Sequence, residues 1–145
     1  MPPSAFSDIP HVIQLAIAPV FLLSSIGTIL SVLSLRLGRI VDRMRVLLDR
    51  RDSVSPERAK KGEAELLLLV RRRTIVNHAI TWTTTAALLV CVLIGTAFIG
   101  SLLGLNTGVL IAALFALAMV AFIAGLFEFL HEVRVASRST HVEFH

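Results

Sequence analysis

Three long blocks without a charged residue constrain the fold of this chain more than any other feature of its sequence. They cover residues 12–35, 79–105 and 109–127. At a rise of about 1.5 Å per residue, each block can cross roughly 30 Å of hydrocarbon as an α-helix. Lipid offers the backbone no hydrogen-bond partners, and the blocks lack the alternating pattern of β-barrel strands. We therefore predict an all-α integral membrane protein with three transmembrane helices.

The chain is short enough for one domain, and we expect residues 1–145 to form a single membrane domain. The predicted spans are about residues 12–35, 75–104 and 109–130, which leaves residues 36–74 between the first two. Hydrophobic residues make up 55% of the chain, more than the roughly 45–50% typical of soluble domains. The segment before the first block contains no Lys or Arg, unlike a cleaved signal peptide, so we expect the first helix to be retained.

The basic residues are distributed very unevenly along the chain. All but two of the 14 Lys and Arg lie between Arg36 and Arg73, and the other two follow the third block. Cytoplasmic segments of membrane proteins carry such an excess, which predicts an outside N-terminus and a cytoplasmic C-terminus. In the cytoplasm these residues face anionic lipid headgroups, and we expect them to contact the headgroups. The bilayer is sufficient reason for the positive charge, so we expect no nucleic-acid partner.

The connection between the first two spans has a helical pattern of its own. Apolar residues recur at three- and four-residue spacing after Arg36, as on one face of an amphipathic helix. We expect the first helix to continue to about Arg50, and Ser55 and Pro56 suit the N-cap and first position of the next. Residues 36–74 are therefore predicted to extend the first two spans as a cytoplasmic antiparallel helical hairpin. The alternative is a helical pair lying flat on the lipid headgroups.

Four segments carry a resemblance to a known family. They are residues 18–23, the R-L-G-R-I-V-D-R run within residues 36–45, the triple arginine at 71–73, and residues 129–134. With these segments the chain resembles the bacterial membrane proteins catalogued as "domain of unknown function 2721", over nearly its whole length. The resemblance implies a mostly helical protein of the bacterial inner (plasma) membrane, and it implies no activity.

Small polar residues occur at helical spacing within the first two spans. The candidate set comprises Ser24, Thr28, Ser31, Asn77, Thr81 and Thr85. One interpretation is helix–helix packing, because hydroxyl and small side chains let helices approach closely in lipid. Another is a polar path along the axis of an oligomer, since three helices cannot easily enclose a pore by themselves. A small-ligand or lipid site is the third.

Charged residues are predicted to gather where the spans meet the cytoplasm. We expect a charge collar of Arg36, Arg39, Asp42, Arg73, His78, Glu128, His131 and Glu132, with Arg72 at the same level. Glu128 and Glu132 are expected to meet arginines there and lock the helices together. A gate sensitive to pH or ions is the alternative, because imidazole titrates near neutral pH. Glu128 with His131, or His141 with His145, has the spacing of a metal pair, but further ligands are missing and we expect no metal.

Motifs of known enzyme classes are not found in the sequence, and we expect neither catalysis nor a cofactor. We therefore predict a non-enzymatic inner-membrane protein, homo-oligomeric, with a structural, accessory or partner-binding role. The alternative function is that of a small oligomeric ion channel or transport protein with a Ser/Thr-lined path.

Overall fold

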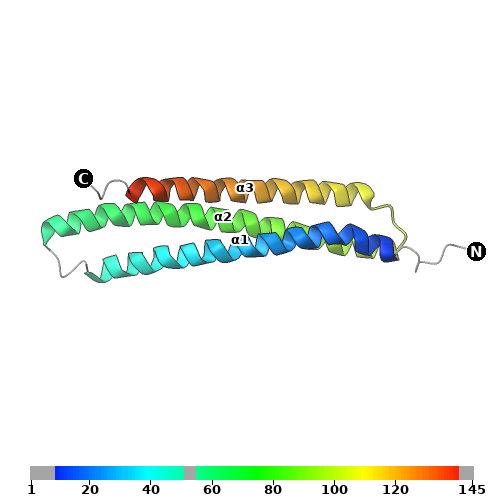
Figure 1. The fold of residues 1–145 in the computed structure, drawn as a ribbon, viewed down its shortest axis with the longest axis horizontal. Helices are drawn as coiled ribbons and strands as arrows, with labels where there is room; N and C mark the ends of the chain where they lie inside the picture. The colour runs from blue at the N-terminus through cyan, green and yellow to red at the C-terminus, as the bar shows by residue number, and fades with distance from the viewer. Residues whose placement is uncertain (1–8, 51–54, 141–145) are drawn as a thin grey trace, which may run out of the picture. The chain divides into compact units, whose positions relative to one another are not determined.

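The computed structural model describes residues 9–50 and 55–140, and nearly all of these residues lie in three long helices. In chain order they are α1 (Ile9–Arg50), α2 (Pro56–Leu102) and α3 (Gly108–Thr140) (Figure 1). The described residues contain no strand. Each helix is long and apolar enough to cross a membrane, which confirms the prediction of an all-α protein with three membrane-spanning helices. The 42 residues of α1 extend over about 63 Å, roughly twice the hydrocarbon thickness.

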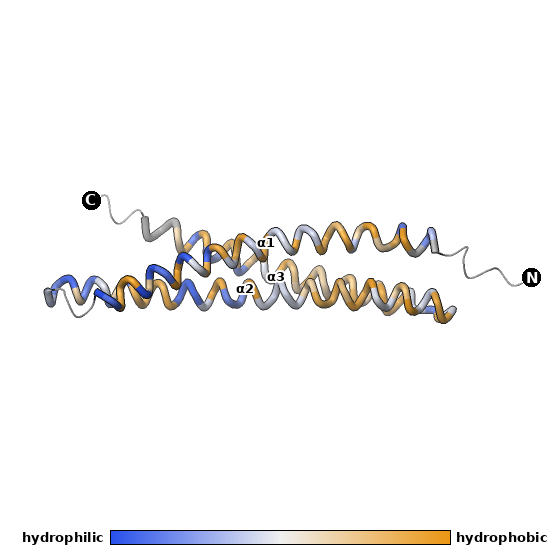
Figure 2. Tube along the Cα trace, turned by 90° about the horizontal axis from the view of Figure 1, so that it is seen from below, coloured by the Kyte–Doolittle hydropathy of each residue, from blue (hydrophilic) through white to orange (hydrophobic). Residues whose placement is uncertain are grey.

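The helices contribute to two compact units. Unit 1 consists of Met1–Leu30 and Trp82–Ala124, and unit 2 consists of Ser31–Thr81 and Gly125–His145. Each helix supplies one segment to each unit. Figure 2 shows that hydrophilic residues gather towards the C-terminal end of α1 and the N-terminal end of α2. Both of these ends belong to unit 2, which therefore holds most of the charge.

Buried residues recur along the helices at intervals of seven. On α1 the series is Ile26, Leu33 and Ile40, and on α2 it is Leu69, Val76, Thr83 and Val90 together with Ala79, Ala86 and Leu93. On α3 the series is Ala118, Gly125 and Glu132. A seven-residue repeat keeps one seam of a helix against its neighbours along its length, as in coiled coils. The small residues in this seam allow the close approach on which helix packing in lipid depends.

Within unit 2, the segments of α1 and α2 form an antiparallel hairpin. Arg43 Nε donates to Glu65 Oε1 at 2.7 Å, and Arg36 and Arg72 both bond Glu132. Arg36 lies seven residues before Arg43 on α1, whereas Arg72 lies seven residues after Glu65 on α2. The two helix segments therefore run in opposite directions. The predicted continuation of the first helix to about Arg50 is confirmed.

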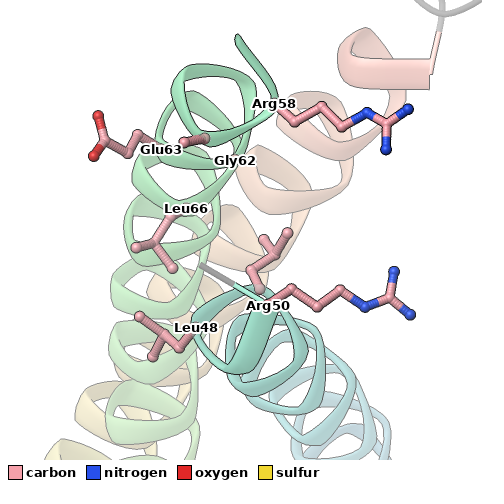
Figure 3. Close-up of a pocket in the computed structure, with 8 residues that line it drawn as sticks. Leu48, Arg50, Arg58, Gly62, Glu63 and Leu66 are labelled. Atoms are coloured by element: carbon pink, nitrogen blue, oxygen red, sulfur yellow. The ribbon is translucent and has the colours of Figure 1, made fainter. Parts of the chain in front are cut away.

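The hairpin tip also begins α2 where the sequence predicted. Pro56 is the first helical residue, and the Ser55 carbonyl accepts a hydrogen bond from the Ala59 N–H at 3.0 Å. A small cavity of about 120 Å³ lies between the C-terminal end of α1 and the N-terminal end of α2. In Figure 3, Leu48 and Leu66 lie close together, while Arg50 extends away from them.

A glycine ends α2 and permits the turn into α3. Gly104 has a φ of 64°, a left-handed conformation that other residues rarely adopt. The Leu105 N–H donates to the Gly100 carbonyl at 2.9 Å, and the Gly104 N–H donates to the Ser101 carbonyl at 3.3 Å. This pair of bonds is the Schellman motif, which satisfies carbonyls at a helix C-terminus. The Thr107 carbonyl then accepts the Ile111 N–H at 2.9 Å at the start of α3.

Two glycines of α2 are expected to respond oppositely to substitution by alanine. A Cβ at Gly62 meets nothing within 4 Å, so Gly62→Ala should stabilise the helix by about 0.5–1 kcal/mol. A Cβ at Gly100 would lie 2.5 Å from Thr107 Oγ1 and 2.7 Å from its Cγ2. The branched threonine is stiff, and Gly100→Ala should destabilise the protein by about 1–3 kcal/mol. Circular dichroism during SDS unfolding measures both changes, and shifts in the same direction would contradict this packing.

Candidate functional site

A fully buried carboxylate joins the three helix segments of unit 2. The side chain of Glu132, on α3, has no exposed surface. Its Oε2 accepts a hydrogen bond from Arg36 Nη1 on α1 at 2.8 Å, and its Oε1 accepts one from Arg72 Nη2 on α2 at 2.8 Å. We call Arg36, Arg72 and Glu132 the three-helix ion cluster. Each carboxylate oxygen holds a different helix.

Burial makes this ion cluster energetically demanding. A buried carboxylate loses its hydration, and only well-aligned charged partners offset that loss. Glu132 has two such partners, whose side chains keep 37% (Arg36) and 24% (Arg72) of their surface exposed. The cluster carries one more positive than negative charge. Removing the carboxylate would leave two partly dehydrated cations without their counter-ion.

Further contacts surround the two arginines. The Arg36 guanidinium carbon lies 5.2 Å from the centre of the Phe129 ring, within the range of a cation–π interaction. Phe129 precedes Glu132 by three residues, so both side chains lie on the same face of α3. The Nε of Arg72 is buried and has no hydrogen-bond partner among the described residues. Two residues of α3, Phe129 and Glu132, therefore contact the guanidinium group of Arg36.

The structure brings only part of the predicted charge collar together. It pairs Arg36 with Glu132 and adds Arg72. Within residues 9–50 and 55–140, the remaining collar residues make no ion pair: Arg39, Asp42, Arg73, His78, Glu128 and His131. Glu128 is half-buried and the other five are exposed. The two roles expected for the charge collar, a structural lock and a gate sensitive to pH or ions, both stay predictions.

The position of Arg72 in the repeat of α2 explains why it, rather than Arg73, bonds Glu132. Arg72 lies seven residues before buried Ala79, on the seam that α2 presents to its neighbours. Arg73 lies one residue further along, about 100° around the helix, and is exposed. From the sequence, both arginines were expected at the same membrane level, and the helix faces on which they lie were not distinguished. The seven-residue repeat of α2 distinguishes them, because it places Arg72 on the buried seam and Arg73 on an exposed face.

The predicted polar-path residues lie on the surface of the chain. Ser24, Thr28, Ser31, Asn77, Thr81 and Thr85 are all exposed. Thr28 Oγ1 donates to the Ser24 carbonyl at 3.2 Å, and Thr81 Oγ1 donates to the Asn77 carbonyl at 2.9 Å. Hydroxyls bonded to their own helix can face lipid, a neighbouring protein or water. None of the six residues is buried between helices of this chain.

A metal site finds no support in the described residues. Residues 9–50 and 55–140 contain no group of three or more His, Cys, Asp or Glu placed to hold a metal ion. Of the two pairs with the spacing of metal ligands, Glu128 and His131 therefore lack further ligands there. His141 and His145 lie outside the described residues.

Three helices long and apolar enough to cross a membrane define this chain as a multi-pass membrane protein. Residues 16–142 match the family described as "Protein of unknown function (DUF2721)", and the chain belongs to that family. This match confirms the resemblance seen in the sequence. Searches of curated proteins and of solved structures gave no match.

Proposed function

We propose that this chain is a non-enzymatic structural or accessory protein of a bacterial inner membrane and that it forms homo-oligomers. The observation that carries the proposal is the three-helix ion cluster. Glu132 is fully buried and each of its oxygens accepts a hydrogen bond from an arginine, so its carboxylate is not accessible to a substrate. Such an arrangement holds helices together, which is what a structural protein requires of its charged residues.

The apolar surfaces support the proposal of homo-oligomers. In the most apolar stretch of each helix, only 11%, 22% and 22% of the residues are buried. The chain therefore leaves most of its membrane-spanning surface available to lipid and to neighbouring copies. The basic residues of segment 36–74 lie outside the hydrocarbon in this proposal, where a partner in the cytoplasm can bind them.

We place the hairpin and the C-terminus in the cytoplasm and the N-terminus outside. The proposal rests on the positive charge of residues 36–74. The alternative for these residues remains a helical pair that lies flat on the lipid headgroups.

One observation favours a second candidate function, that of a small oligomeric ion channel. The six polar-path residues are exposed rather than packed within the chain. In an oligomer with these residues at its axis, their hydroxyl and amide groups would line a wet path.

Ion flux through liposomes containing the purified protein distinguishes the two candidates. Under the structural proposal, fluxes of K⁺, Na⁺, Cl⁻ and protons should equal those of empty liposomes, and native mass spectrometry should show an oligomer. Thr28→Val keeps the side-chain shape and removes the hydroxyl. Under the structural proposal, Thr28→Val should change neither flux nor assembly. It should change the free energy of unfolding by less than about 2 kcal/mol.

Thr96→Val is the matched control for this experiment. Thr96 also bonds its own helix, through the Val92 carbonyl at 2.8 Å, but it is outside the polar-path set. A wild-type flux that falls in Thr28→Val and persists in Thr96→Val would overturn the structural proposal in favour of the channel. A monomer in native mass spectrometry would contradict the proposed homo-oligomer.

A further inference from the structure

A cleft of about 440 Å³ lies between the α1 and α2 segments of unit 2. Four arginines dominate its lining, with one carboxylate and two apolar side chains: Arg36, Arg39, Arg43, Arg72, Glu65, Ile40 and Leu69. We call it the arginine cleft. Four like charges around one space repel each other, and carboxylates or bound anions reduce this repulsion.

The two carboxylates that bond arginines of this cleft do not balance the charge of its four guanidinium groups. Glu65 bonds Arg43, and Glu132 bonds Arg36 and Arg72. Two carboxylates against four guanidinium groups leave a charge of +2. Arg39 makes no ion pair among the described residues. The cleft therefore retains the charge that a singly or doubly charged anion would balance.

Hydrogen-bond donors also remain available. A guanidinium group carries five N–H donors in a planar fork that matches the oxygens of a phosphate. Arg36 and Arg72 each use one of these donors on Glu132. Because Glu132 fixes both groups in place, less side-chain freedom would be lost when an anion binds.

The location of the cleft in the sequence indicates where its anion comes from. Arg36 directly follows the uncharged block 12–35, and Arg72 lies three residues before the start of the predicted second span, at about residue 75. In the proposed topology this is the depth at which phospholipid headgroups lie. Ile40 and Leu69 are buried to 4% and 7% exposure and form the apolar side of the lining. A lipid, which combines a phosphate with an apolar body, suits such a boundary better than a soluble anion.

We propose that the arginine cleft binds the phosphate group of an anionic phospholipid. The inference rests on the proposed membrane orientation, but not on the oligomeric or non-conducting character of the protein. Arg39 and Arg43 are the residues to test, because neither belongs to the three-helix ion cluster.

Native mass spectrometry of the full chain in detergent, titrated with short-chain lipids, measures this binding. Phosphatidylglycerol should bind at least about tenfold more tightly than phosphatidylcholine of the same chain length. The Arg39→Gln/Arg43→Gln variant should lose about tenfold or more in affinity for phosphatidylglycerol, since charge-assisted bonds are removed. Arg39→Gln alone should lose a smaller part and serves if the double variant folds poorly.

The matched control removes the same charge elsewhere on the hairpin. Arg50 and Arg58 lie at the hairpin tip, where their side chains extend to the same side and away from Glu63 (Figure 3). Arg50→Gln/Arg58→Gln should bind phosphatidylglycerol like the wild type. An equal loss in both double variants, or equal binding of the two lipids, would overturn the site in favour of diffuse attraction. Displacement of the lipid by millimolar inorganic phosphate would overturn the lipid as its occupant. Flux and oligomer measurements are unaffected by either result, so the two proposals fail independently.

Discussion

Glu132→Gln should lower the free energy of unfolding by about 2–4 kcal/mol. Glutamine keeps the size of the side chain but removes the charge that both arginines require. Arg36 and Arg72 would then lie near each other, partly dehydrated and without a counter-ion. Their partial exposure lets water hydrate them, so the loss should be smaller than that of a fully buried pair. Unfolding by SDS in mixed micelles, followed by circular dichroism, measures the change.

Glu128→Gln provides the control for this prediction. Glu128 lies four residues before Glu132 on α3, is half-buried, and makes no ion pair within the described part of the chain. Its substitution should change the free energy of unfolding by no more than about 0.5 kcal/mol. Equal losses in the two variants would show that the ion cluster does not hold the helices.

The second large effect concerns topology, where labelling should be nearly all-or-none. Ser55→Cys, at the hairpin tip, should react with a membrane-impermeant maleimide only after the cells are opened. Asn106→Cys, between α2 and α3, should react in intact cells. Both positions are exposed, and the excess of Lys and Arg around the hairpin gives this orientation.

The labelling needs a background without the native thiol. Cys91 is exposed on α2, so both variants should carry Cys91→Ala. Permeabilised cells should label both positions and thereby show that each cysteine is reactive. Reaction of position 55 in intact cells, with position 106 protected, would reverse the proposed orientation.

The three membrane-spanning helices were predictable because lipid imposes strong, local constraints on the sequence. Charges are excluded from the hydrocarbon, so uncharged blocks mark the helices directly. The start of α2 was equally local, since Ser55 and Pro56 suit a helix start whatever packs around them.

The partners within the ion cluster were harder to predict because they depend on helix rotation. Consecutive residues such as Arg72 and Arg73 lie about 100° apart around a helix, and only one can face the neighbouring helices. The buried seam through Val76 and Ala79 determines which one. In a membrane, lipid-facing and buried positions are both apolar, so hydrophobicity alone does not reveal that seam.

The direction of the hydroxyl residues was ambiguous for a related reason. A threonine such as Thr28 bonds the carbonyl of its own helix whether it faces protein, lipid or water. Its presence in a span therefore does not indicate packing within the chain. The structure places it on the surface.

A double-mutant cycle between Arg72 and Glu132 in lipid-containing micelles tests the central claim most directly. Arg72→Gln and Glu132→Gln are measured singly and together against the wild type. If the buried carboxylate holds α2 and α3 together, the double variant should lose at least about 1.5 kcal/mol less than the sum of the single variants. Losses that add to within about 0.5 kcal/mol would contradict the claim that this ion pair holds the helices together.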